Sequence, residues 1–384
     1  MPRSYPPHRS ILTALALAHA LLTFTQTSFT TTAGGFRAED GVGVLANGTG
    51  YLSGVRAFAE PLHVAALWGY SLAGGNTSQT VLPLSDRVFL QGLKEAPGGA
   101  IGFGSVFPAD SSTHDMLLFK VSLTGALIWV TRPALAHDQQ LLGLTVLTDG
   151  SVVACGIDNA TGKHEALVAR FDANGQLLWH STAGSSLDVE AHGVAVDGSL
   201  VMVTGREVDF SGRSDAFFAL FDMSGNLTWT TSWGGAADEI GRALVRTAPG
   251  KFIMAGTTSS FGPTTTTGQR KECVYMMQLD LLGDTVWTAT IGDTLFHRKA
   301  LAMTIATNGD LLVAGAREQD NAGDAMVLRV STAGLMVWER IYQAGGDDRL
   351  LAIQALPVGF VATGWSNGVD SRQVLLVRRN DAGN

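Results

Sequence analysis

A glycine that closes a short apolar run recurs seven times along this chain, in tripeptides such as VTG, MAG and VAG. Successive copies lie 50, 52, 49, 51, 59 and 49 residues apart. The positions are Gly54, Gly104, Gly156, Gly205, Gly256, Gly315 and Gly364. A repeat of about fifty residues built from β-type runs is typical of a β-propeller, in which each copy forms one blade. The sequence therefore predicts an all-β, seven-bladed propeller with a structural role for these glycines.

The fourth copy shows the internal pattern of the repeat most clearly. Its runs read AHGVAV, SLVMVTG, DAFFALFD and NLTWTTSW, with turns at Asp197-Gly198 and Ser224-Gly225. Short runs separated by Gly and Asp turns indicate antiparallel strands joined by hairpins. The third run is apolar on both faces, as expected for a strand covered by two neighbouring sheets. We expect four-stranded antiparallel blades, with strands A to D numbered outward from the central channel.

The fourth run carries a tryptophan in five copies. A large flat side chain at one fixed place in each blade suits the space between adjacent twisted sheets, so we expect a packing role. These residues are Trp129, Trp179, Trp229, Trp287 and Trp338. Counting from the repeat glycine places Trp68 in strand C of the first copy, and the usual tryptophan position then falls near Thr77.

The two ends of the chain complement each other. The last copy stops after its third run, and residues 29–35 match residues 179–185 of a fourth run, with Phe29 in the tryptophan position. We therefore expect the N-terminal segment to pair with strand C of the last blade, which closes the ring and hides the edge strands. A single propeller domain is predicted over residues 27–384.

The repeat also carries a family resemblance. The pattern D-A-x-x-x-x-x-D-x-x-G-x-x-x-W-x-x-x-x-G-G, followed by a DG hairpin ending in V-x-G, resembles the repeats of secreted, mostly bacterial propeller proteins labelled seven-bladed propeller or delta-60 repeats. It covers residues 27–384 and implies a scaffold with few assigned activities. The GxLLW turn is also similar to the tryptophan docking motif of quinoprotein dehydrogenases. Those enzymes have eight blades, a vicinal cysteine pair and a calcium site, whereas Cys155 and Cys273 lie far apart here.

The composition of the chain and its first residues narrow the binding partners and the cellular location that we expect. The net charge is −8 without any basic run, which argues against nucleic acid as a partner. Arg3 and Arg9 precede an apolar run that ends near Ala20, the pattern of a signal peptide over residues 1–20, with a transit peptide as the alternative. No later segment is apolar enough for a membrane anchor. We expect a monomer that is secreted, periplasmic or on the cell surface, with four sequons for possible glycosylation.

No catalytic, metal or cofactor motif stands out in the chain. Acids recur before strand A, and we expect their oxygens to accept backbone N–H groups rather than bind calcium. They include Asp138, Asp188, Asp238 and Asp348. Three histidines near the starts of strands A, His137, His192 and His297, could converge on a metal, but their repeat offsets differ, which favours separate roles. The two cysteines could be idle thiols or a disulfide. We expect no cofactor and no metal.

The loops between strands B and C vary most from copy to copy, which points to that face as the functional one. They mix Arg and Asp with Phe210, Phe261 and Trp365, and the fifth loop is longer by about eight residues around 262–268. Polar groups with an exposed aromatic suit glycan or peptide recognition. The candidate ligand-binding residues are Arg206, Asp209, Arg270, Lys271, Arg317, Asp320 and Trp365.

These observations favour a non-catalytic binding or scaffold module over an enzyme. Solvated loops without a ligand are one alternative. The other is a polysaccharide hydrolase or lyase that uses the central channel. Three or more ionisable side chains converging in that channel would favour the enzyme, and a filled channel would favour the binding module.

Overall fold

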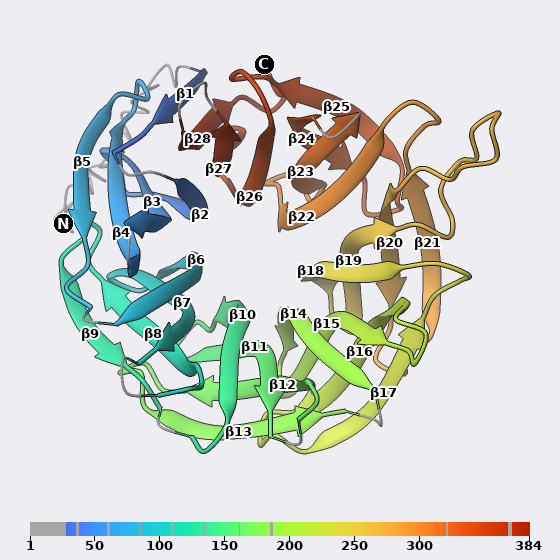
Figure 1. Ribbon diagram of the computed structural model, residues 1–384, viewed down its shortest axis with the longest axis horizontal. Coiled ribbons are helices and arrows are strands. Elements are labelled where there is room, and N and C mark those ends of the chain that lie inside the picture. Colours follow the sequence, from blue (N-terminus) through green and yellow to red (C-terminus); the bar gives the residue numbers. More distant parts are fainter. Residues whose placement is uncertain are drawn as a thin grey trace, which may run out of the picture.

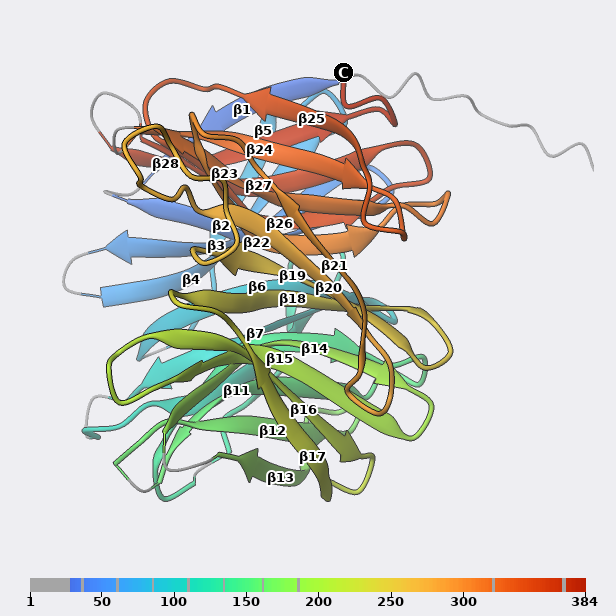
Figure 2. The ribbon, with the colours of Figure 1, turned by 90° about the vertical axis from the view of Figure 1, so that its right-hand side faces the viewer.

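The computed structural model describes residues 28–35, 38–59, 62–84, 86–108, 111–133, 135–160, 162–184, 187–319, 322–367 and 371–384. These residues form seven four-stranded antiparallel sheets arranged in a ring (Figure 1). Viewed from the side, the ring carries loops on both faces (Figure 2). The predicted seven-bladed β-propeller is confirmed. The signal peptide expected at residues 1–20 and the expected domain start at residue 27 lie outside the described residues.

Each blade runs from an innermost strand A to an outermost strand D. Blade 1 contains β2 (Glu39–Ala46), β3 (Gly50–Ala59), β4 (Leu62–Ser71) and β5 (Asn76–Val81); blade 2 contains β6 (Arg87–Ala96), β7 (Gly99–Phe107), β8 (Asp115–Val121) and β9 (Leu127–Thr131); blade 3 contains β10 (Asp138–Val146), β11 (Val152–Asn159), β12 (Glu165–Phe171) and β13 (Leu177–Ala183). Blade 4 contains β14 (Asp188–Asp197), β15 (Leu200–Val208), β16 (Ser214–Asp222) and β17 (Leu227–Trp233); blade 5 contains β18 (Glu239–Ala248), β19 (Lys251–Thr258), β20 (Cys273–Leu279) and β21 (Thr285–Ile291). Blade 6 contains β22 (His297–Ile305), β23 (Leu311–Gln319), β24 (Ala322–Val330) and β25 (Met336–Tyr342); blade 7 contains β26 (Asp348–Ala355), β27 (Phe360–Asn367), β28 (Arg372–Arg379) and β1 (Phe29–Ala33).

Blade 7 joins the two ends of the chain, as expected. The first strand, β1, pairs antiparallel with β28, from Phe29 opposite Arg378 to Ala33 opposite Val374. Figure 1 shows the two strands side by side, next to the C-terminus. The edge of β28 is thereby covered, and the ring closes without an open strand between the first and last blades.

The hydrophobic core lies between the blades rather than at the axis. Seven apolar clusters among the described residues each join two neighbouring sheets. Strand C supplies both sides: Phe217 of β16 packs toward blade 3, and the next residue, Phe218, packs toward blade 5. Because successive side chains of a strand point to opposite faces, such a strand must be apolar throughout.

The repeat glycine is explained by an irregularity in strand A. Every innermost strand has a β-bulge, and in blades 2 to 7 the repeat glycine of strand B pairs with the residue just before it. A Cβ atom at Gly205 would lie 1.7 Å from the backbone oxygen of Glu190. In blade 1 the register differs by one residue, since Gly54 pairs with the residue after the bulge and Val55 takes the usual glycine position.

The tryptophans of strand D pack against turn glycines of the following blade. A Cβ atom at Gly225, which has φ of 88°, would lie 2.8 Å from the Trp179 ring. The Trp179 indole N–H also donates to the Met223 carbonyl oxygen of that turn, at 3.0 Å. Phe29 stands in the same position, because Gly74 of blade 1 lies against its ring. In blade 1 the position belongs to Ser78, one residue from the expected place.

Trp68 is fully buried in β4, the strand C predicted for it. Cys155 and Cys273 are free and buried. Burial raises the pKa of Cys273 to about 11 and also raises the pKa of Cys155, so both thiols stay protonated at neutral pH. Within the described ranges, no helix has the length and apolar character needed to cross a membrane.

Candidate functional site

The connections between strands B and C, and between strand D and the next strand A, lie on one face, which we call the variable-loop face. Arg206 of β15 lies there but is held by Glu190 of β14 through Nε and Nη2 contacts of 2.9 and 2.8 Å. Asp209 accepts hydrogen bonds from the backbone N–H groups of Ser211 and Arg213, which orders its own turn. Both side chains therefore have local partners in blade 4.

The candidate residues of blades 6 and 7 are also held by neighbours. Arg317 donates to Asp324 at 2.8 Å, and its guanidinium lies 4.4 Å from the Phe296 ring centroid. Trp365 is only 6% exposed, so the expectation of an exposed aromatic there does not hold. Two guanidinium groups lie over its indole ring, that of Arg372 on the neighbouring strand β28 at 4.1 Å and that of Arg349 on β26 at 5.2 Å.

The remaining candidates lie in the long loop of blade 5, residues 259–272. Arg270 is exposed and forms an isolated backbone bridge with Thr264, and Lys271 is half-buried beside it. Asp320 lies outside the described residues. The candidates thus come from four successive blades.

Three exposed aromatic residues, which we call the aromatic surface, belong to blades 4 and 5: Phe210 and Phe261 in B–C loops and Trp233 at the end of β17. Their exposed fractions are 86%, 41% and 45%. The loops that carry them touch, because Arg213 donates to the Ala236 carbonyl oxygen at 3.2 Å and the Ala237 N–H donates to Ser260 Oγ at 2.8 Å.

Sequence reasoning missed Trp233. The matching positions hold Ala183, Ile291 and Tyr342, which are 2%, 8% and 6% exposed.

The second candidate site is the central channel, which the bulge of each strand A borders. The bulge residues all border one cavity of about 400 Å³ along the axis: Val42, Gln91, Leu142, His192, Arg242, Leu301 and Leu351. A glycine or alanine follows each of them and lets the blades approach closely. A Cβ atom at Gly143, for example, would lie 2.4 Å from the His192 carbonyl oxygen of the next blade. The channel is therefore narrow but not filled.

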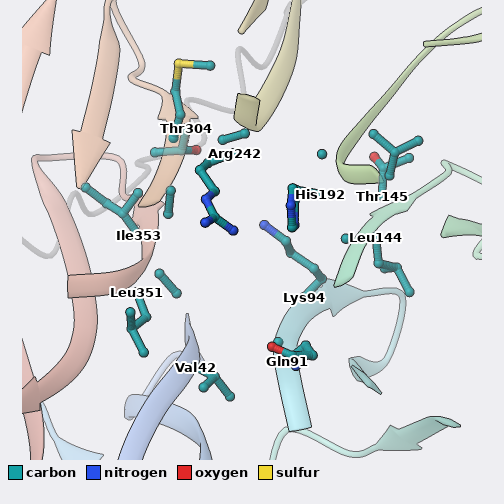
Figure 3. Close-up of a pocket in the computed structure, with 18 of the residues that line it drawn as sticks. Val42, Gln91, Lys94, Leu144, Thr145, His192, Arg242, Thr304, Leu351 and Ile353 are labelled. Atoms are coloured by element: carbon teal, nitrogen blue, oxygen red, sulfur yellow. The ribbon is translucent and has the colours of Figure 1, made fainter. Parts of the chain in front are cut away.

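Among the described residues, three basic side chains belong to the lining of the channel. Figure 3 shows Lys94, His192 and Arg242 pointing into it from β6, β14 and β18. Lys94 is exposed, and the protein packed around it lowers the pKa of its ammonium. Burial likewise lowers the pKa of Arg242, with Arg206 adding to the effect. Sequence reasoning missed Lys94 and Arg242.

Glu190 stands beside this group and is already engaged. His192 Nε2 lies 3.2 Å from its Oε2, without the alignment of a good hydrogen bond, and Arg206 binds it through two nitrogens. Burial opposes its ionisation, but the contacts with His192 and Arg206 outweigh burial and lower the pKa of the carboxyl. Burial lowers the pKa of His192, which leaves the imidazole largely neutral at pH 7.

The other predicted polar residues have structural contacts. His137 and His297 pair with Asp158 and Glu272 at 3.8 and 3.2 Å, away from His192. No group of three or more potential metal ligands is found in the part of the chain that the structure describes.

Three of the four acids before strand A cap the backbone, as expected, whereas the fourth, Asp138, contacts the side chains of His114 and Gln140. Asp188 and Asp238 accept the N–H groups of His164 and Ser214, each at 2.8 Å. Asp348 accepts the N–H of Ala344 at 2.7 Å.

Comparisons with known proteins find chains of similar fold, but they do not identify the function of this one. No family model and no curated protein matches the chain. Among solved structures, the phage phi92 endosialidase is similar with a TM-score of 0.51 and 9% identity, over 92% of this chain and 69% of that one. The likeness is one of fold alone. A protein of unknown function from Bacteroides caccae aligns with a TM-score of 0.41 and 11% identity, over 72% of this chain and 90% of that one.

Proposed function

We propose that this protein is an exported, non-catalytic binding module that holds a protein or glycan ligand on its variable-loop face. The observation that carries the proposal is the aromatic surface, in which Phe210, Trp233 and Phe261 are exposed over loops that touch. Aromatic rings that are apolar on their faces and surrounded by polar groups suit sugar rings and peptide side chains. A rigid propeller beneath them keeps the loops in place.

The polar surroundings of the aromatic surface support the same proposal. Asp209 and Arg213 form a pair at 3.0 Å beside Phe210, and both remain partly exposed. Arg270 is exposed on the longer loop beyond Phe261. These groups offer donors and acceptors around the rings, so the ligand would combine apolar faces with hydroxyl, amide or charged groups.

The test is a binding screen of residues 21–384 against an oligosaccharide array and a displayed peptide library. We expect a specific ligand, whose affinity falls about tenfold or more when Phe210 and Trp233 are changed to Ala. Leu335→Ala is the matched control, because Leu335 is 70% exposed on a C–D turn of the opposite face. Unchanged affinity in the Phe210→Ala/Trp233→Ala protein, or no ligand in either library, would contradict the proposal.

Export and membership of the propeller repeat family belong to the same proposal. They are supported by residues 1–20 and by the repeat pattern that places Trp179 and Gly225 in contact between blades. Attachment of residues 1–20 to a reporter enzyme should direct that enzyme out of the cytoplasm.

A second candidate function, a polysaccharide-acting enzyme, is favoured by the open channel with Lys94, His192 and Arg242 directed into it. Cationic groups could neutralise a sugar carboxylate, and a neutral amine or imidazole could accept a proton. Glu95 is the one carboxylate among the described residues that line the channel, and it accepts a hydrogen bond from Gln354 at 2.7 Å. Depolymerisation of acidic polysaccharides by the intact chain would support this candidate.

A further inference from the structure

We propose that the central channel binds a small organic anion, with an oxyanion group held by Lys94 and Arg242 and an apolar body against the opposite wall. This site is separate from the aromatic surface, and it requires no catalysis.

The positive charge in the channel is balanced only in part by the protein. Among the described residues, neither Lys94 nor Arg242 has a hydrogen bond or an ion pair with a carboxylate, although the chain as a whole is acidic. Glu190, which lies near Arg242, is occupied by Arg206 and His192. Glu95 accepts a hydrogen bond from the neutral Gln354 amide and keeps its charge, so it offsets one of the two cations. The described lining therefore carries a net positive charge while the net charge of the chain is −8.

Such an arrangement is costly unless something compensates it. Cations withdrawn from bulk water lose hydration, and two cations that share a cavity repel each other. The surrounding protein lowers the pKa of both Lys94 and Arg242, and Arg206 adds to the effect on Arg242. A bound anion would supply the missing countercharge, and the guanidinium could hold two of its oxygens at once.

The walls of the channel define the rest of the ligand. Around the bulge ring, blades 6, 7 and 1 contribute Leu301, Leu351 and Val42 in succession, whereas blades 4 and 5 contribute His192 and Arg242. One arc is thus apolar and another is basic, with Lys94 entering from blade 2 (Figure 3). An inorganic ion would leave the apolar arc uncovered, so an anion with a hydrocarbon or aromatic part fits better.

The volume of the cavity sets an upper bound on the size of the ligand. A volume of about 400 Å³ is within the range of small-molecule sites and far below that of a folded partner. The close approach of blades at Gly43 and Gly193 leaves little freedom for the ring to widen. A small molecule therefore fits within the cavity.

Titration calorimetry with three probes tests the proposal: naphthalene-1-sulfonate, inorganic sulfate and 1-naphthalenemethanol. We expect the sulfonate to bind at least about tenfold more tightly than either other probe, because it alone combines an oxyanion with an apolar body. Arg242→Gln and Lys94→Met should each weaken sulfonate binding by about tenfold or more. Arg246→Gln is the matched control, since Arg246 is on the same strand but pairs with Asp197 outside the channel lining.

A second measurement separates binding from folding. Without a probe, the Arg242→Gln protein should unfold at the same temperature as the parent or higher, because the change removes an uncompensated cation. The proposal is overturned if the parent binds no probe more tightly than about 1 mM, if the alcohol binds as well as the sulfonate, or if the channel variants bind like the parent. The Phe210→Ala/Trp233→Ala protein should keep sulfonate binding, so failure here is distinct from failure of the loop-face proposal.

Discussion

The glycine that recurs about every fifty residues marks a position of strand B where a side chain has no room. Strand A bulges inward once in every blade, and in blades 2 to 7 the backbone before the bulge comes so close to strand B that a Cβ atom would overlap a carbonyl oxygen. In these six blades glycine is required by distance and not by backbone torsion, because Gly205, for example, is not among the residues with positive φ. In blade 1 the equivalent position holds Val55.

Gly205→Ala should lower the free energy of unfolding by about 1–3 kcal/mol or more, as expected when atoms are forced into packed structure. The cause is the 1.7 Å approach of the new Cβ atom to the Glu190 oxygen. Denaturant unfolding measures the change. Gly75→Ala is the control, since its Cβ atom would lie 3.5 Å from Ser71 Oγ. Equal effects of the two substitutions would contradict the explanation.

At the level of the strands, much could be predicted from the sequence because each blade repeats the same contacts. The turn glycines and the tryptophans recur together, since the indole of the preceding blade packs against the turn glycine where a Cβ atom would otherwise lie. Blade 1 was harder, because Val55 takes the glycine position and Ser78 takes the tryptophan position. In such a blade, counting along the sequence places each strand position only to within one residue. The strand pairing seen in the structure fixes the register.

Deletion of residues 29–33 should lower the melting temperature of the ring strongly. The change removes β1, exposes the edge of β28 and uncovers the core that Phe29 shares with Tyr51, whose ring centroid lies 5.8 Å away. Thermal unfolding followed by circular dichroism gives the midpoint. Deletion of the exposed loop tip 264–268 is the control and should leave the midpoint nearly unchanged. A β1-deleted protein that melts like the parent would rule out closure by this strand.

At the scale of the whole molecule, the sequence indicated the aromatic surface better than it indicated the site in the central channel. The variable loops stand out because they differ between copies, and Phe210 and Phe261 were found that way. Lys94 and Arg242 were missed because they lie inside innermost strands, and only the three-dimensional ring brings these strands together around the channel. The exposure of Trp365 was predicted wrongly, since its cover comes from Arg372 and Arg349 on other strands.

Stability of the whole ring should fall in acid. Hydrogen bonds from Arg298 lower the pKa of Asp293 to about 2, and the contacts of Glu190 lower its pKa below the ordinary 4.5. Carboxyls whose pKa is lowered by folding stabilise the protein above their unfolded values and lose that contribution as the pH falls through the folded values. We expect a level melting temperature above about pH 5 and a decline below about pH 4.5.

Glu190→Gln should make that decline shallower and lower the melting temperature at pH 7, where the parent carboxylate is paired with Arg206. Melting temperatures measured from pH 7 to pH 3 check both statements. A parent curve that stays level to pH 3 would contradict the assignment of these carboxyls.

The pairing of β1 with β28 also has a consequence for how the protein is made. The first strand to leave the ribosome needs a partner that is synthesised more than three hundred residues later, as Phe29 and Arg378 show. Contacts this distant in sequence form slowly. Until β28 arrives, the nascent ring stays open with an unpaired edge, which is the period when chaperones, proteases and aggregation compete for it.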